Sequence, residues 1–158
     1  MPFYYDVNRS VTTNATANTE TGPETAVRTG TGVQMAMMAF YGSSKSPSGT
    51  SLAGVMYRVK TFATANTVGT AITAGKRNAN SPTAVTGWFS GATTGTTATV
   101  RMTIGMSAPG GAGGWMAVEP DAALQLQSGG GANGNLEVFH IAGIASIVTD
   151  YTVDFADR

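Results

Sequence analysis

Apolar and polar residues alternate with a period of two along much of this chain, which is the pattern of a β-strand with one buried face. The alternation is clearest over residues 55–60, 100–104, 124–127 and 150–155. A helical period is absent nearly everywhere, and residues 120–124 could form one helical turn at most. The residues predicted to face inward are Val55, Tyr57, Val59, Val100, Met102, Ile104, Tyr151, Val153 and Phe155.

Two segments, residues 32–41 and 136–148, are apolar on both faces. They predict strands buried on both sides, or strands whose outer face meets a partner. Gly143 is expected to break the second segment into two strands or a bulge. Stretches rich in Gly, Pro, Ser and Asn separate the strands, so the chain predicts an all-β sandwich or barrel. These turn-rich stretches are residues 42–49, 75–82, 108–114 and 128–135.

Residues 8–31 differ from the rest because they are rich in Thr, Asn, Ala and Gly and contain few apolar side chains. Such a segment predicts an extended N-terminal arm that a partner surface would order. The preceding aromatic cluster Phe3, Tyr4 and Tyr5 could attach that arm to a neighbour. We therefore divide the chain into an N-terminal strand and polar arm, residues 1–31, and a β-sandwich domain, residues 32–158.

Charged residues make up only 11% of the 158 residues, and the formal net charge is zero. A surface with so few charges and no net charge does little to keep a monomer soluble, so this composition favours a chain whose surface is largely covered by partners. Residues 25–114 contain seven bases and no acid, whereas residues 115–158 contain six acids and one base. Either the two regions neutralise each other within one fold, or they form opposite patches that join neighbouring copies head to tail.

No arrangement of side chains in the sequence predicts catalysis. The single histidine, His140, lies in an apolar strand and is interpreted as a packed, hydrogen-bonded residue. There is no cysteine and no Gly-x-Ser-x-Gly motif. Glu119 and Asp121 flank a proline and are interpreted as a solvated turn, and the glycines of 129–134 precede a strand rather than a helix. We expect no enzyme, no metal site and no cofactor.

Partner contacts are predicted at two further places. Lys76 and Arg77 form an adjacent basic pair in a loop, and Trp88 and Phe89 form an aromatic pair in a region rich in Gly, Thr and Ser. Zero net charge argues against nucleic-acid binding, and no apolar stretch reaches the length of a membrane helix. Trp115 is expected in the core. Trp88 and Phe89 could also stack on a sugar ring, so a carbohydrate-binding module stays open as an alternative.

Residues 69–78 (GTAITAGKRN) and 113–126 (GGWMAVEPDAALQL) resemble small structural proteins of tailed bacteriophages, of the capsid cement or decoration type. The resemblance covers about the last two thirds of the chain and carries no catalytic residue. It implies a virion protein with a jelly-roll or related β-sandwich fold that oligomerises on the capsid or the tail.

The sequence thus leads to a hypothesis of a jelly-roll-like capsid cement protein. Its expected partners are the major capsid protein and copies of itself in a homotrimer, with no nucleic acid and no membrane. We expect it on the capsid surface of the virion after synthesis in the host cytoplasm, since residues 1–6 do not read as a signal peptide. The alternatives are a tail or tail-tip component and the carbohydrate-binding module. The expected contact residues are Phe3, Tyr4, Tyr5, Lys76, Arg77, Trp88 and Phe89.

Overall fold

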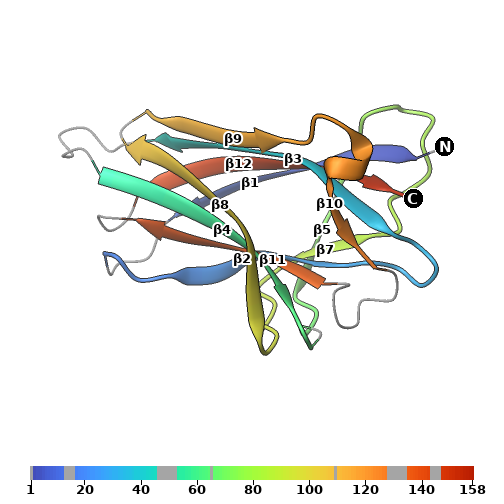
Figure 1. Cartoon of the computed structure of the whole chain (residues 1–158), viewed down its shortest axis with the longest axis horizontal. Helices are drawn as coiled ribbons and strands as arrows, with labels where there is room; N and C mark the ends of the chain where they lie inside the picture. Colours follow the sequence, from blue (N-terminus) through green and yellow to red (C-terminus); the bar gives the residue numbers. More distant parts are fainter. Residues whose placement is uncertain are drawn as a thin grey trace.

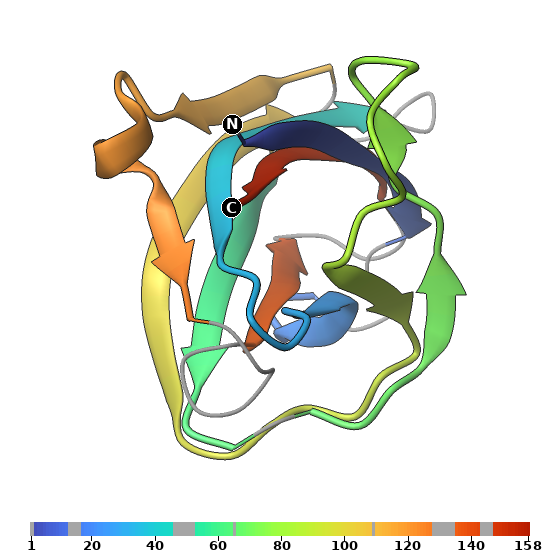
Figure 2. The same cartoon turned by 90° about the vertical axis from the view of Figure 1, so that its right-hand side faces the viewer.

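The computed structural model describes residues 2–12, 17–45, 53–64, 66–108, 110–127, 135–142 and 147–158. Within them, antiparallel strands form two sheets that face each other across one core (Figures 1 and 2). A single 3-10 turn, Pro120–Ala122, falls where one helical turn was expected. The predicted all-β sandwich is confirmed.

The first sheet has the strand order β10-β3-β12-β1-β6, and β9 also pairs with β3. Its strands are β1 (Phe3–Thr12), β3 (Met35–Lys45), β6 (Gly75–Lys76), β9 (Ala112–Met116), β10 (Leu124–Leu126) and β12 (Val148–Asp157). Since β9 and β10 pair with successive parts of β3, they form one interrupted edge of this sheet.

The second sheet has the order β5-β7-β2-β11-β4-β8. Its strands are β2 (Thr21–Arg28), β4 (Ala53–Phe62), β5 (Thr70–Ile72), β7 (Gly87–Ser90), β8 (Ala98–Ala108) and β11 (Asn135–Ala142). Strand β8 lies at the edge of this sheet, on the same side of the molecule as β9 and β10 (Figure 1).

The strand pairs are nested along the chain. Strand β1 pairs with β12, β2 with β11, β3 with β9 and β10, and β4 with β8. The outermost pair and the β3 pairs belong to the first sheet, while the other two pairs belong to the second. A long antiparallel ribbon wrapped in this way is a jelly-roll-like β-sandwich. The wrapping also places the two chain ends close together (Figure 2).

The core is built by the alternation seen in the sequence. In β4, Val55, Tyr57 and Val59 are buried, and in β12 the alternate residues Tyr151, Val153 and Phe155 are buried, as predicted. The second doubly apolar segment divides into β11 and β12, also as predicted. Gly143 itself lies outside the described residues, as do residues 46–49, 109 and 128–134 of the turn-rich stretches.

Strand β8 departs from its expected pattern. Ile104 is buried and Met102 is half-buried, but Val100 is 50% exposed. The register with β4 shifts here: Met102 pairs with Val59, whereas Val100 pairs with Lys60. A bulge inserts an extra residue and moves the side chains beyond it to the other face. Val100 therefore joins the face of Lys60 instead of the core.

The expected polar arm is a part of the sandwich rather than an extension from it. Residues 3–12 form β1 between β12 and β6, and residues 21–28 form β2 between β11 and β7. A polar side chain of β2 can be buried where it finds a hydrogen-bond partner: the Thr25 hydroxyl is buried and is hydrogen-bonded to the Tyr151 hydroxyl. The partners of β1 and β2 are distant in sequence, so local composition could not reveal this pairing. Residues 13–16 lie outside the described part.

Candidate partner-binding surface

The single histidine, His140, is packed in the interior among aromatic and polar side chains. His140 is fully buried, its ring meets Tyr57 edge-on at 6.2 Å, and its Nδ1 lies 3.2 Å from Glu24 Oε1. Among the described residues, no group of three or more His, Cys, Asp or Glu side chains is placed to hold a metal ion. Within the same residues, no helix has the length and apolar character needed to cross a membrane.

The structure brings two of the predicted contact segments together. Strand β6 pairs with β1, and the Arg77 amide donates to the Tyr4 carbonyl at 3.1 Å. Phe3, Tyr4 and Arg77 line one hollow of about 580 Å³ with Asn78, Asn80 and Ser81, while Lys76 is exposed beside them. The predicted aromatic cluster and basic pair are therefore neighbours on the surface, although more than 70 positions separate them in sequence.

Two predicted contact residues belong to the core instead. Tyr5 is 1% exposed, stacks on Phe155 at 5.4 Å and donates its hydroxyl to the Pro82 carbonyl. Trp88 is also 1% exposed, and its ring lies 5.1 Å from the same Phe155 ring. Neighbouring residues of a strand point to opposite faces, so Tyr4 and Tyr5 cannot share a surface role. Phe89 is half-buried.

The outer face of the first sheet carries an apolar surface that the sequence indicated only in part. Tyr41 of β3 is 45% exposed and Met116 of β9 is 63% exposed. The Tyr41 hydroxyl lies 3.4 Å from the Met116 sulfur. We call Tyr4, Tyr41 and Met116 the outer-face patch, because all three line one hollow of about 340 Å³. Tyr41 ends the segment 32–41, whose apolar character on both faces was the available signal.

An ion pair lies within the outer-face patch. Arg77 contacts the Asp154 carboxylate, and both side chains line the same hollow as Tyr41 and Met116. The hydrogen bond that the Arg77 guanidinium donates to the Asp154 carboxylate raises the pKa of Arg77. The patch therefore combines aromatic and thioether groups with a paired charge.

The basic and acidic parts of the chain neutralise each other at two ion pairs of the described residues. Lys45 pairs with Asp150 across β3 and β12, and Arg77 of the basic region pairs with Asp154 of the acidic region. Hydrogen bonds from Lys45 and Ser10 lower the pKa of Asp150. The structure thus shows the first of the two expected arrangements for these pairs.

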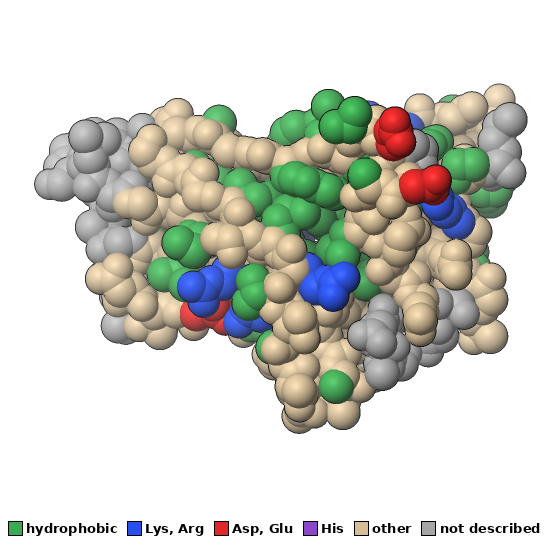
Figure 3. All heavy atoms as spheres, in the orientation of Figure 1, with side chains coloured by type: hydrophobic (Ala, Val, Ile, Leu, Met, Phe, Trp, Pro, Cys, Tyr) green, Lys and Arg blue, Asp and Glu red, His purple; other side chains and the backbone are tan. Residues whose placement is uncertain are grey.

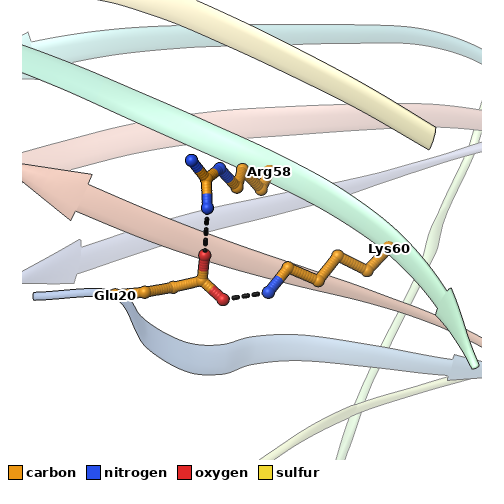
Figure 4. A network of polar contacts seen from close by, with 3 residues as sticks. All are labelled: Glu20, Arg58 and Lys60. Atoms are coloured by element: carbon orange, nitrogen blue, oxygen red, sulfur yellow. Dashed lines mark hydrogen bonds and ion pairs between the residues drawn. The ribbon is translucent and has the colours of Figure 1, made fainter. Parts of the chain in front are cut away.

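The outer face of the second sheet is covered by a polar network of the chain itself. Figure 4 shows Glu20, just before β2, reaching over β11 to two bases of β4. Its carboxylate lies 3.0 Å from Arg58 Nη1 and also contacts Lys60. The Lys60 ammonium lies 4.4 Å from the centre of the Phe139 ring. The network joins both neighbours of β11 above its outer face.

A buried carboxylate lies on this same face. Glu137 of β11 is fully buried and accepts a hydrogen bond from the Gly95 amide at 3.0 Å. Gly95 belongs to the segment that returns from β7 to β8, so the loop packs onto the sheet through this bond. Burial raises the pKa of Glu137 despite the hydrogen bonds from Gly95 and Asn66.

A groove runs along the open edge of the sandwich, between β8 on one side and β9, the 3-10 turn and β10 on the other. It has a volume of about 590 Å³. Figure 3 shows hydrophobic side chains in the hollow between these strands. We call it the edge groove; its lining residues are Val100, Arg101, Met102, Trp115, Ala122, Ala123, Leu124 and Gln125. Trp115 was expected in the core; it packs against the core but remains partly exposed in the groove.

Two glycines define the closed end of the edge groove. A side chain on Gly113 would place its Cβ 2.6 Å from the Gly105 carbonyl oxygen, which is too close for any residue but glycine. Strands β8 and β9 therefore touch at this end and separate toward the 3-10 turn (Figure 1). The separation exposes part of the core in the groove.

Comparison with known proteins gives no family for this chain. No family model matches, and no curated protein matches. A decameric BFDV capsid protein is 10% identical with a TM-score of 0.37, and each chain is covered completely. T=1 particles derived from infectious bursal virus are 10% identical, with a TM-score of 0.24, covering 99% of this chain and 40% of that chain. At these scores the likenesses carry no argument about function.

Proposed function

We propose that this chain is a non-enzymatic structural protein of a virion, and specifically a capsid cement protein that binds across major capsid subunits. The observation that carries the proposal is the outer-face patch on a jelly-roll-like sandwich. Aromatic side chains and methionine are enriched in protein interfaces, and exposed apolar patches mark sites of association. The resemblance of residues 69–78 and 113–126 to phage structural proteins supports the same function.

The outer-face patch has the features of a contact surface. Tyr4 and Tyr41 come from strands on opposite sides of β12, and the Arg77–Asp154 ion pair lies in the hollow that they line. A tyrosine supplies a large apolar ring and a polar hydroxyl at low cost in side-chain entropy. Phe3, the first residue of β1, lines a neighbouring hollow together with Tyr4 and Arg77.

The mechanism is additional buried area between capsid subunits. A protein that binds only the assembled shell stabilises that shell by linkage, because disassembly must also break the new contacts. The pressure of packaged nucleic acid would then act against more contacts. This role requires binding and no chemical step, and it would place the chain on the capsid surface.

Copy number in purified virions tests this function first. Quantitative mass spectrometry of virions that contain this chain should give hundreds of copies for a cement protein. A small multiple of three or six copies would instead support the tail or tail-tip component. Absence from purified virions would contradict both structural functions.

A paired substitution tests the outer-face patch. Tyr41→Ser combined with Met116→Ser should reduce the occupancy of capsids stripped of this protein at least about tenfold, since truncating interface anchors costs about 2 kcal/mol or more each. Val68→Ser is the matched control, because Val68 is also exposed but lies between β4 and β5, outside the patch. Equal occupancy of the double variant and the control would remove the patch from the capsid contact.

The residues expected to bind a sugar do not form an exposed aromatic platform. It required Trp88 to present a face to a sugar ring, and Trp88 is buried against Phe155.

A further inference from the structure

We infer that the edge groove binds the edge groove of a second copy of this chain, with a two-fold axis running along the groove. This contact goes beyond the proposed capsid contact, because it uses another surface and can be measured without capsids. Four features of the described residues lead to it: an uncovered edge strand, an exposed part of the core, charges of opposite sign on the two rims, and the lack of a net charge that would oppose self-association.

The first feature is the edge strand β8. It has 11 residues, and within the described part of the chain only β4 pairs with it. Its first residues, Ala98 to Arg101, are all exposed. Long exposed edge strands tend to associate with other chains unless they are covered or carry several charges. Arg101 is the single charged residue of β8, so this edge is weakly protected.

The second feature is the floor of the edge groove. Met102, Trp115 and Leu124 pack against the core from three strands but remain partly exposed. Val100 adds an apolar side chain at the β8 rim because the bulge turns it away from the core. Covering these groups would remove apolar area from water without reorganising the backbone.

The third feature is the charge on the rims. Arg101 lies on the β8 rim. Among the described residues, it forms no ion pair with an acidic side chain. The opposite rim contains Ala122 and Ala123, directly after Asp121, whose side chain is 98% exposed. Asp121 Oδ1 lies 3.9 Å from Arg158 Nη1, at the limit of an ion pair, and Glu119 is exposed nearby. One rim is therefore basic and the other acidic.

This arrangement of charge selects the symmetry. A two-fold axis along the groove exchanges the two rims, so the basic rim of each copy faces the acidic rim of the other. An axis across the groove would place acid against acid. Two-fold contacts between identical surfaces are the commonest in soluble oligomers. Each pair forms twice, and the apolar floors meet between the two pairs.

The fourth feature is the low overall charge. The chain has a formal net charge of zero, and charged residues make up 11% of it. Copies of the chain therefore do not repel one another at neutral pH, and a small local complementarity can set the geometry of the contact.

A charge-exchange experiment tests the contact. Sedimentation equilibrium of the full chain should show a dimer whose dissociation constant rises at least about tenfold in Arg101→Glu and in Asp121→Lys, because each change introduces two repulsive pairs. An equimolar mixture of the two variants should restore dimerisation, since both pairs become attractive again in the mixed dimer. Lys76→Glu, an exposed base on β6 outside the groove, should leave the dissociation constant unchanged.

Circular dichroism and thermal unfolding of each variant separate lost association from lost folding. Since the mixture contains the same two chains, its recovery cannot come from refolding. A monomer at all concentrations, unchanged dimerisation of both variants, or a mixture that stays monomeric would each overturn the inference. A trimer, which was expected from the sequence, would also overturn it. None of these outcomes affects the capsid-binding test of the outer-face patch.

Discussion

The outer face of the second sheet is covered by its own chain, whereas the outer face of the first sheet exposes aromatic and thioether groups. Over β11, Glu20 holds Arg58 and Lys60, and Glu137 is buried beneath the segment that contains Gly95. On the first sheet, Tyr41 and Met116 remain open to solvent. Both faces belong to the same sandwich, so the fold alone does not decide which face is available. The segments that carry Glu20 and Gly95, just before β2 and between β7 and β8, supply the difference.

Because one face is covered and the other is open, substitutions on the two faces should have different effects on stability and on partner binding. Residues of the covered face and of the core should affect the free energy of unfolding. Residues of the outer-face patch should affect partner binding while leaving the free energy of unfolding nearly unchanged. The following substitutions test that separation, in order of decreasing expected effect.

Trp88→Ala should have the largest effect on stability. The indole is buried against Phe155, so its loss leaves a cavity and should lower the free energy of unfolding by about 3–5 kcal/mol. Urea unfolding followed by circular dichroism measures the change. Phe89→Ala, at the neighbouring half-buried position, should cost clearly less. Equal costs would mean that Trp88 is not part of the core.

Glu137→Gln should change how stability depends on pH. Burial raises the pKa of Glu137 above its ordinary value of 4.5, so the folded state binds the proton more tightly than the unfolded state. The favourable contribution is complete below the ordinary value and is lost as the pH rises through the raised pKa. The free energy of unfolding of the wild type should therefore fall relative to that of Glu137→Gln on going from pH 4 upward. Unfolding at a series of pH values measures this, and parallel curves would contradict it.

Glu20→Gln should have a smaller effect. The variant loses the charge that holds Arg58 and Lys60, and partly exposed pairs of this kind contribute up to about 1 kcal/mol. The loss should shrink in high salt, because salt screens the wild-type network. Lys45→Gln is the matched control, since it removes one single ion pair, with Asp150, whose lysine side chain is 65% exposed. An equal loss in both variants would argue against a special role of the network.

Tyr41→Ser should have the smallest effect on stability. The side chain lies on the open face, so the free energy of unfolding should change by no more than about 0.5 kcal/mol. The same variant should bind stripped capsids more weakly. A loss of several kcal/mol in unfolding would show that the outer-face patch is structural and would weaken the proposed function.

Part of the candidate surface could be predicted from the sequence. Phe3, Tyr4, Lys76 and Arg77 were predicted as contact residues and are exposed together, although their role in binding stays a prediction. Tyr5 and Trp88 were placed with them because a cluster of aromatic residues does not show which member faces inward. That assignment depends on the strand register, and Tyr5 and Trp88 both meet Phe155 from different sheets.

The edge groove could not be predicted. Its lining comes from β8, β9, the 3-10 turn and β10. It is closed at one end, where Gly113 and Gly105 allow β9 and β8 to approach closely, and it opens where the two strands separate. The exposure of Val100 depends on a bulge in the pairing of β8 with β4. Neither feature has a local sequence signal.

The sequence by itself determined the class of the fold and the identity of most inward residues. Alternation with a period of two acts within each strand, so Val55, Tyr57, Val59, Tyr151, Val153 and Phe155 could be assigned without knowing their neighbours. Only the tertiary structure decided that residues 3–12 and 21–28 belong to the two sheets. A polar segment becomes a stable strand when distant strands satisfy its backbone, as β12 and β11 do here. The same long-range pairing decided which outer face stays open.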